Sequence, residues 1–169
     1  MNAYCRIDTP LGPMWATAEH RVLTSLNFDS ERIRVRVIRD GERRDDDPVL
    51  ARTRAEIAEY FAGTRQRFTV PVGPRGTPFQ QRVWAHLRTI PFGATSTYGA
   101  IARALGDAKA VRAVGAANGR NPVAILIPCH RVIGSDGSLT GYAGGLPRKR
   151  ALLDLEARGR FILTSPGAA

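Results

Sequence analysis

The sequence predicts a two-domain α/β protein, in which a small α/β domain precedes a mainly helical one. Apolar and polar residues alternate in short segments before residue 30, as is typical of half-buried strands. Helix-capping signals become frequent only after residue 76, and the glycine- and proline-rich stretch Val72–Gly76 separates the two patterns. With 43% hydrophobic residues among 169, the chain can form real cores. We therefore expect domains at 1–75 and 76–169.

Four strands are expected in the N-terminal half. Three follow from the alternating segments Tyr4–Ile7, Met14–Thr17 and Val22–Phe28. Glu31–Asp40 also alternates, with apolar residues at positions 33, 35 and 37 opposite arginines at 32, 34 and 36. This period of two predicts a fourth, half-buried strand with an arginine face. Solvation is a more common role for such a charge run than contact with DNA.

Helices are expected wherever a capping residue precedes an apolar periodic segment. Thr77 and Gln80 form the clearest signal, a capping box at the start of a helix that stops before Pro91. The other expected helices run from Pro48 to about 62, from Tyr98 to about 105, from Ala108 (after a cap at Asp107) to about Asn118, and from Pro147 onward. Two of them, joined by Gly106-Asp107, form a candidate helix-turn-helix, although many helical hairpins bind nothing.

The charge of the chain indicates a polyanion as its partner. The formal net charge is +10, and residues 76–169 carry 12 basic against 4 acidic side chains. Excess positive charge confined to one half is typical of nucleic-acid binding. All basic residues except Lys109 and Lys149 are arginines, which suits bidentate recognition of phosphate. A codon bias toward arginine explains the same ratio equally well.

Other features exclude several classes of protein. The longest apolar run, Val123–Pro128, is far shorter than the ~20 residues that cross a bilayer. The N-terminus lacks the basic start and apolar core of a signal peptide. Two cysteines, Cys5 and Cys129, exclude a disulfide-rich secreted scaffold and a multi-cysteine zinc site. We expect a cytoplasmic protein with two free thiols, no cofactor and no membrane partner.

The expected helix at 108–118 is poor in side chains that read bases. Most of its residues are alanine, valine or glycine. Small side chains allow close approach to a minor groove only ~6 Å wide, so the helix favours DNA binding without sequence preference. Tight packing inside a core is the alternative. Arg112, in the middle of this helix, could bind a phosphate, form a surface ion pair or enter the base stack, and the sequence favours the first two.

The sharpest feature is the run Asn121–Val132, in which a rigid apolar segment bounded by two prolines leads to Cys129. A thiol with a pKa of ~8.5 is mostly protonated at neutral pH, so a nearby base or cation must release the thiolate. His130 and Arg131 are candidates for that role. A buried, inert cysteine beside a core histidine is the alternative.

Segments after Cys129 offer a candidate pocket and a candidate carboxylate to orient the histidine. A loop with five glycines between residues 134 and 145 contains Tyr142 and is long enough to wall a pocket. The helix that begins at Pro147 carries Glu156, whose carboxylate could orient His130 and complete a Cys–His–Glu relay. A cysteine hydrolase using this relay is one hypothesis for the function. A non-catalytic DNA-binding regulator is another.

The motif Pro128-Cys129-His130-Arg131-Val132 closely resembles the active-site motif of the O6-alkylguanine-DNA alkyltransferases, also called methylated-DNA–protein-cysteine methyltransferases. The resemblance covers nearly the whole chain and is strongest from Phe79 to Glu156. Its supporting motifs are Thr77–Trp84, Ile90–Gly93, Thr97–Gly99, Arg112–Gly115, Asn121-Pro122, Gly141–Gly145 and Glu156.

This resemblance implies a direct, irreversible transfer of an alkyl group from O6 of guanine, and less efficiently from O4 of thymine, to a cysteine. The nucleotide is flipped out of duplex DNA for the reaction. The fold implied is a ribonuclease H-like N-terminal domain followed by a helix-turn-helix domain. Cys129 is then the nucleophile, His130 acts as a base through a water, and Glu156 orients His130.

Further residues receive roles from the same resemblance. Tyr98 would donate a hydrogen bond to the base, and Asn121 would brace the turn beside the thiol. Arg112 matches the arginine that fills the gap left by the flipped nucleotide, which replaces the phosphate interpretation. The substrate pocket is expected from Val132, Tyr142, Ala143 and Gly144, and the DNA-facing helix from Ala110, Val111, Ala113 and Gly115.

The chain departs from the family pattern at two points. Ala143 stands where other members have serine, which bears on the tolerance for bulky alkyl groups. Some members bind a structural zinc, but outside the active motif this chain has only Cys5, His20 and His86, so no metal is expected. Cys5 is expected to be an inert strand residue. The expected partner is alkylated double-stranded DNA, bound in the minor groove without sequence preference by a monomer, with cooperative binding left open.

Overall fold

The computed structural model describes residues 2–164, with side chains described up to residue 159. These residues divide into two compact units, each described by itself below. The first unit comprises the chain up to Arg75 together with Pro122–Ala124, and the second comprises Gly76–Asn121 and the chain from Ile125 onward. The mixed α/β fold class is confirmed: the first unit contains a sheet and the second is mainly helical.

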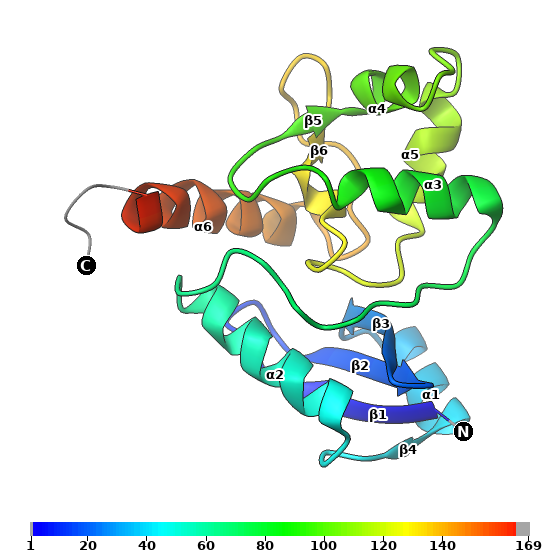
Figure 1. Ribbon diagram of the computed structural model, residues 1–169, viewed down its shortest axis with the longest axis vertical. Helices are drawn as coiled ribbons and strands as arrows, with labels where there is room; N and C mark the ends of the chain where they lie inside the picture. The colour runs from blue at the N-terminus through cyan, green and yellow to red at the C-terminus, as the bar shows by residue number, and fades with distance from the viewer. Residues whose placement is uncertain (1, 165–169) are drawn as a thin grey trace. The chain divides into compact units, whose positions relative to one another are not determined.

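The first unit is built on a four-stranded sheet of order β3-β2-β1-β4 (Figure 1). The three strands expected from alternation are present, and β1 pairs with β2 and β2 with β3 in antiparallel register. A short fourth strand pairs with β1 in parallel. The strands are β1 (Asn2–Ile7), β2 (Met14–Glu19), β3 (Val22–Phe28) and β4 (Gly41–Arg43). Five consecutive residues of β2 are buried, so both faces of this strand are covered.

The segment Glu31–Asp40 forms helix α1, so the prediction of an arginine-faced strand was wrong. The side chain of Ser30 accepts a hydrogen bond from the backbone amide of Ile33, which caps the first turn. In the helix only Val37 is buried, and Val35 is 56% exposed. The alternation of arginine and apolar residues therefore does not correspond to an inner and an outer face.

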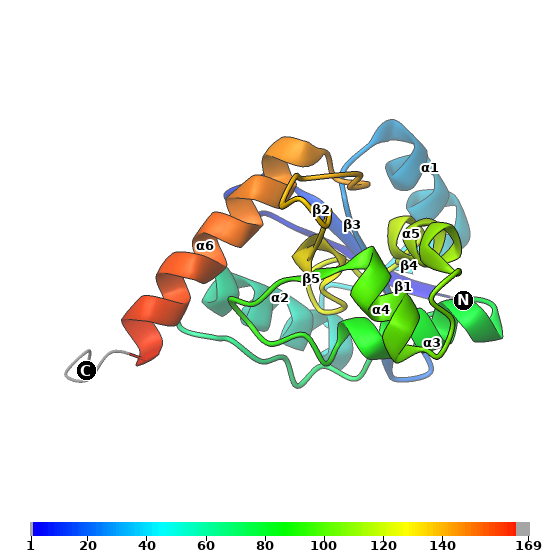
Figure 2. The same ribbon diagram turned by 90° about the horizontal axis from the view of Figure 1, so that it is seen from above.

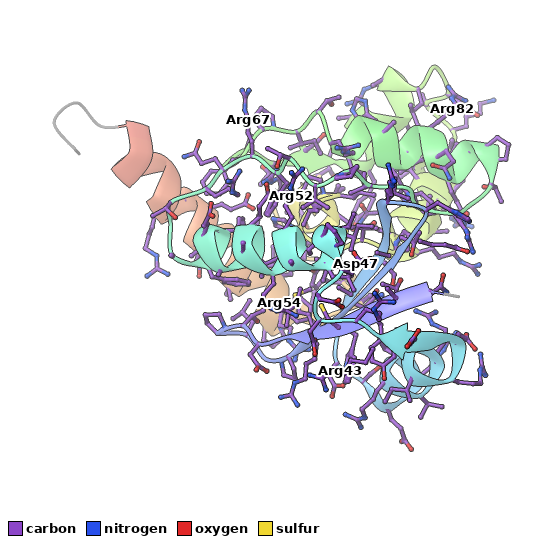
Figure 3. The ribbon with its side chains drawn as sticks, turned by 60° about the horizontal axis from the view of Figure 1, so that its bottom comes forward. Arg43, Asp47, Arg52, Arg54, Arg67 and Arg82 are labelled. Carbon is purple, nitrogen blue, oxygen red and sulfur yellow. The ribbon has the colours of Figure 1, made fainter. Side chains whose placement is uncertain are left out.

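Helix α2 (Pro48–Phe61) packs on the sheet and begins where the sequence predicted. Asp47 caps it by accepting hydrogen bonds from the amides of Val49 and Leu50, and Figure 3 shows Asp47 at the start of this helix. Glu56 on α2 is buried, and its carboxylate accepts hydrogen bonds from the backbone amides of Thr69 and Val70. This carboxylate holds the segment after α2 against the helix.

The first unit also contains a segment from far along the chain. Pro122–Ala124 lies beside the end of β3: the amide of Leu26 donates to the carbonyl of Pro122 and its carbonyl accepts from the amide of Ala124. Val123 forms an isolated parallel bridge with Leu26 and is fully buried. The sequence placed residues 122–124 in the second domain, at 76–169, whereas in the structure they pack with the first unit.

The second unit contains α3 (Pro78–Leu87), α4 (Tyr98–Ala104), α5 (Val111–Gly119) and α6 (Leu146–Thr164) (Figure 2). The predicted capping box of Thr77 and Gln80 is present at the start of α3. The indole of Trp84 on α3 donates a hydrogen bond to the carbonyl of Ala117 on α5, which fixes these two helices together. No helix within residues 2–164 is both long and apolar enough to cross a membrane.

Helix α5 begins later than the sequence predicted. Residues 108–110 form a turn, in which the side chain of Asp107 accepts from the amide of Lys109 and the amide of Ala110 donates to the Asp107 carbonyl. Asp107 therefore caps a turn rather than the helix itself. Gly106 lies between α4 and this turn. Its φ of 86° is in the left-handed region, which favours glycine. The two helices contact each other, as a helix-turn-helix requires.

The buried Glu56 generates a prediction about stability. We expect Glu56→Gln to lower the free energy of unfolding by roughly 1–3 kcal/mol, because glutamine has one acceptor oxygen where the carboxylate uses two: Oε2 accepts from the amides of Thr69 and Val70, and Oε1 accepts from the hydroxyl of Thr69. Urea unfolding followed by circular dichroism measures the change. The control is Glu59→Gln on the same helix, where a carboxylate that is 44% exposed forms a surface ion pair with Arg65. Equal effects of the two substitutions would contradict the prediction.

Candidate active site

The candidate nucleophile lies in a tight turn. Cys129–Arg131 forms a single turn of 3₁₀ helix, η1, directly after Pro128. Upstream, Ile125 has a φ of 72°, a conformation that a β-branched residue adopts only when its surroundings impose it. The amide side chain of Asn121 donates a hydrogen bond of 2.7 Å to the carbonyl of Ile127 and so braces the segment that leads to the cysteine.

A buried carboxylate anchors the two residues that follow the cysteine. Glu156, on α6, lies 2.6 Å from Nε2 of His130 and accepts a hydrogen bond of 2.7 Å from Nε of Arg131. Arg131 also donates to the carbonyl of Ile90, so its guanidinium is occupied by the carboxylate and the backbone. The sequence offered His130 and Arg131 as groups that could release the thiolate. Arg131 is bound to Glu156, whereas His130 has a second ring nitrogen that does not face this carboxylate.

The second ring nitrogen of His130 is available. His130 is fully buried, and its Nδ1 has no hydrogen-bond partner among the described residues. Because Nε2 faces the carboxylate, the hydrogen on that nitrogen is held there and Nδ1 is left as the basic atom. A buried basic nitrogen on the residue that follows Cys129 makes His130 the candidate base for the thiol.

Burial keeps the ground state of the site neutral at both the thiol and the imidazole. It raises the pKa of Cys129, which a hydrogen bond from Asn121 and the charge of Lys149 oppose. It lowers the pKa of His130, against the hydrogen bond and charge of Glu156. Burial also disfavours the anionic form of Glu156, but His130 and Arg131 outweigh it and lower its pKa to about 2. Since Arg131 is permanently charged, Glu156 stays anionic while His130 is neutral.

Lys149 is a site residue that the sequence analysis did not identify. It lies on α6 with its side chain fully buried, and its ammonium donates hydrogen bonds of 2.5 Å to the carbonyl of Val132 and 2.8 Å to that of Thr140. Burial lowers its pKa, and the nearby Cys129 raises it. The ammonium therefore ties the two ends of the loop 133–140 together. Its rarity, as one of two lysines among 25 basic residues, was the only signal in the sequence.

A short parallel pair of strands brings Tyr98 to the same region. β5 (Ser96–Thr97) pairs with β6 (Val132–Ile133), and α4 begins at Tyr98, capped by Thr97. The hydroxyl of Tyr98 donates to the carbonyl of Thr140 at 3.3 Å, the same carbonyl that Lys149 holds. The hydroxyl of Tyr98, the predicted donor to the base, is thus positioned by the loop that contains Thr140.

A pocket of about 460 Å³ collects several of the predicted residues. It is lined by Tyr98, Val111, Gly115, Asn118, Gly119, Thr140, Gly141, Tyr142 and Ala143. Burial raises the pKa of Tyr142 well above its ordinary value, so its phenol is neutral. Asn118, which the sequence analysis did not select, joins this pocket to the nucleophile, because its side-chain amide donates to the carbonyl of Cys129 at 3.4 Å.

The predicted DNA-facing residues of α5 lie at or near its N-terminal end. Val111, Arg112 and Ala113 are exposed, Ala110 precedes the helix, and Gly115 lies where an added Cβ would be 3.8 Å from the ring of Tyr98. Val111 and Gly115 line the pocket, whereas Gly144 and Val132 do not. Among residues 2–164, no group of three or more metal-binding side chains is found, and the absence of a metal stays a prediction.

The shifted pKa of Glu156 generates a prediction about acid stability. Its folded pKa of about 2 lies below the ~4.3 of an unfolded glutamate, so its stabilising contribution is present above pH ~4.3 and is lost as the pH falls toward 2. We expect about 3 kcal/mol of acid-dependent stability from this group, at ~1.4 kcal/mol for each pKa unit. Glu156→Gln should be less stable at neutral pH and lack this dependence.

Urea unfolding between pH 7 and pH 2 measures the difference between the wild-type protein and the variant. Asp154→Asn, which changes an exposed carboxylate on the same helix, is the control and should keep the wild-type dependence on pH. If the curves for the wild-type protein and Glu156→Gln run parallel over this range, the assigned role of the carboxylate is wrong.

Two family models match consecutive parts of the chain. The model described as "6-O-methylguanine DNA methyltransferase, ribonuclease-like domain" matches residues 3–74, and "6-O-methylguanine DNA methyltransferase, DNA binding domain" matches residues 78–158. Residues 75–77, at the end of the glycine- and proline-rich stretch Val72–Gly76, lie between the two matches.

Individual relatives agree with these matches. The chain is 46% identical to the methylated-DNA–protein-cysteine methyltransferase of Mycobacterium tuberculosis, over 92% of this chain and 93% of that protein. It is 43% identical to the constitutive enzyme of that name from Bacillus subtilis, over 90% and 93%.

The crystal structure of the M. tuberculosis O6-methylguanine methyltransferase superimposes with a TM-score of 0.83, covering 99% of this chain and 96% of that one at 44% identity. A crystal structure of the M. tuberculosis protein in complex with DNA gives a TM-score of 0.84 over 98% of this chain and 96% of that one, also at 44% identity. The shared domains, sequence identity and fold lead to one conclusion. This chain belongs to the methylated-DNA–protein-cysteine methyltransferase family.

Proposed function

We propose that this protein repairs O6-alkylguanine in double-stranded DNA by transferring the alkyl group, once and irreversibly, to Sγ of Cys129. The observation that carries this proposal is the arrangement next to the thiol, in which Glu156 holds Nε2 of His130 and the buried Nδ1 has no partner among the residues that the structure describes. The DNA-bound structure of the M. tuberculosis relative supports DNA as the carrier of the substrate.

In the proposed reaction the thiol of Cys129 first loses its proton toward Nδ1 of His130 through an intervening water, and the Glu156 carboxylate stabilises the imidazolium. The thiolate attacks the alkyl carbon in line with the bond to O6. The S–C bond forms as the C–O6 bond breaks, and the electron pair passes to the guanine. The proton released by the thiol ends on the guanine, so the products are S-alkylcysteine and unmodified guanine. Nothing in this sequence of steps regenerates the thiol.

Residues of the pocket and of the segments next to it are assigned roles around the base in this reaction. We assign the hydroxyl of Tyr98 to the ring of the departing guanine: it exchanges its hydrogen bond to the carbonyl of Thr140 for one to the ring as negative charge develops there. Asn121 stabilises the thiolate, because its hydrogen bond lowers the pKa of Cys129. Tyr142 and Ala143, with the backbone at Val132 and Gly144, complete the site for the flipped base. O4-alkylthymine presents a similar ether on a smaller ring and is proposed as a slower substrate.

A thiol at 6% exposure cannot reach an atom inside a duplex, so the nucleotide must rotate out of the stack. We propose that α5 lies in the minor groove, where exposed small residues such as Ala113 let the helix backbone approach. Arg112, which is exposed on the same helix, fills the gap in the stack. This mode of binding reads no sequence, in keeping with lesions that arise in any context, and a monomer is sufficient for it.

The single-use chemistry is tested by mass spectrometry after incubation with a duplex that contains one O6-methylguanine. We expect the wild-type protein to gain one methyl group on Cys129 and then to stop, whatever the excess of substrate. Cys5→Ser should behave like the wild type, because Cys5 is buried in β1 and burial raises its pKa. Cys129→Ser should transfer nothing. Repeated turnover, which a cysteine hydrolase would give, contradicts the proposal.

The role of Arg112 is tested by comparing two substrates. We expect Arg112→Ala to slow methyl transfer from duplex DNA by at least about tenfold, or ~1.4 kcal/mol, because nothing then replaces the flipped nucleotide. The rate with free O6-benzylguanine, which needs no flipping, should hardly change. Arg88→Ala removes the same charge from an exposed position at the end of α3 and should leave both rates close to wild type. Equal slowing of the two substrates by Arg112→Ala would exclude the role in flipping.

A further inference from the structure

In the side-chain amide of Asn118, the nitrogen forms a hydrogen bond and the oxygen does not. Its Nδ2 donates to the carbonyl of Cys129, and a carbonyl can only accept, so this contact fixes the orientation of the amide. Oδ1 is then directed away from Cys129, and it has no hydrogen-bond partner among the described residues. The residue is only 3% exposed. A buried acceptor without a partner is unfavourable and rare, so a donor from outside the protein is expected to occupy it.

A second residue of the same pocket, Tyr142, also carries an unsatisfied polar atom. The hydroxyl of Tyr142 is buried and also lacks a partner within the described part of the chain. Asn118 comes from α5 and Tyr142 from the loop before α6, yet both line the pocket of about 460 Å³. The remaining wall contains small or apolar residues such as Val111, Gly115 and Ala143. The pocket therefore offers an acceptor on Asn118 and a hydroxyl on Tyr142 that can donate or accept. Tyr98 and Thr140 are the other polar side chains in its lining.

The position of Asn118 determines which part of a substrate it can meet. The alkyl carbon that reacts must reach Sγ of Cys129, and Asn118 contacts the backbone of that same residue. The atoms of a longer alkyl group, beyond the reacting carbon, must then lie next to the pocket wall that Asn118 helps to form. An apolar chain would cover Oδ1 without replacing its hydrogen bond, whereas a chain ending in a hydroxyl would supply the missing donor.

We propose that Asn118 makes the alkyl subsite selective for O6-adducts that carry a hydroxyl group, such as 2-hydroxyethyl, over apolar adducts of the same length, such as propyl. Tyr142 assists by offering its own hydroxyl to the same group. This inference rests on the proposed function and specifies its substrate class. The bond changes are unchanged: the S–C bond forms, the C–O6 bond breaks, and the hydroxyl of the adduct takes no part in them.

The test measures single-turnover rates for one duplex that carries either O6-(2-hydroxyethyl)guanine or O6-propylguanine. We expect the wild-type protein to react about tenfold faster with the hydroxyethyl adduct, the factor that one lost hydrogen bond to a buried group typically produces. Asn118→Leu, which replaces the amide by an apolar group of similar size, should bring the ratio of the two rates close to one. Asn27→Leu makes the same change on β3 in the first unit and should leave the ratio at its wild-type value.

The ratio separates a subsite from a merely structural role, because a distorted active site slows both substrates alike. A ratio that stays the same in Asn118→Leu while both rates fall would overturn the inference. If Asn118→Leu does not fold, Tyr142→Phe serves instead: it removes only the hydroxyl and should lower the ratio severalfold, and an unchanged ratio there overturns the inference as well. Failure of the proposed function looks different, since the wild-type protein would then transfer no methyl group to Cys129.

Discussion

The carboxylate of Glu156 is the interaction on which the rest of the active site depends. It holds two consecutive residues of η1, His130 and Arg131, and accepts a further hydrogen bond from the amide of Gly93 at 3.3 Å. One side chain on α6 thereby fixes the turn that carries the nucleophile and the segment before β5. A buried carboxylate in such a place must be paired and hydrogen-bonded on both oxygens, because an unpaired charge there is strongly unfavourable. Arg131 meets that requirement, which leaves His130 free to remain neutral.

A neutral thiol in the free protein suits the proposed role of Cys129, which would react only once. Burial raises the pKa of Cys129, so most molecules hold a thiol rather than a thiolate at neutral pH, and thiols react slowly with stray electrophiles. The groups that favour the thiolate, Asn121 and the ammonium of Lys149, are already in place. Burial thus favours the neutral thiol, while a hydrogen bond and a cation that favour the thiolate lie beside it.

Local features were predictable from the sequence, and features that depend on distant contacts were not. The caps at Asp47 and Thr77 bind amides two or three residues away, so short patterns were sufficient to place α2 and α3. At Glu31–Asp40 the alternation of side chains was misleading, because the cap at Ser30 and the exposure of most of the helix decide the outcome. Lys149 and Asn118 were missed because their partners, Val132 and Cys129, become neighbours only in the fold. The motif around Cys129 predicts a nucleophile there, but it carried no sign that Arg131 binds Glu156 rather than assisting the thiol.

The short segment Pro122–Ala124 makes the first unit discontinuous in sequence. The amide and carbonyl of Leu26 bond to backbone groups about a hundred positions later in the chain, so β3 gains its last partners only after the first half of the second unit, Gly76–Asn121, has been synthesised. Pairings of such long sequence separation are slow to form, because a large loop must close before any contact compensates for the lost entropy. A fragment that stops at Arg75 would leave Leu26 with an unpaired amide and carbonyl at an open sheet edge, which is a site for association with other chains. The N-terminal half therefore cannot be exchanged between relatives by itself. A chimaera must also take residues 122–124 from the same parent.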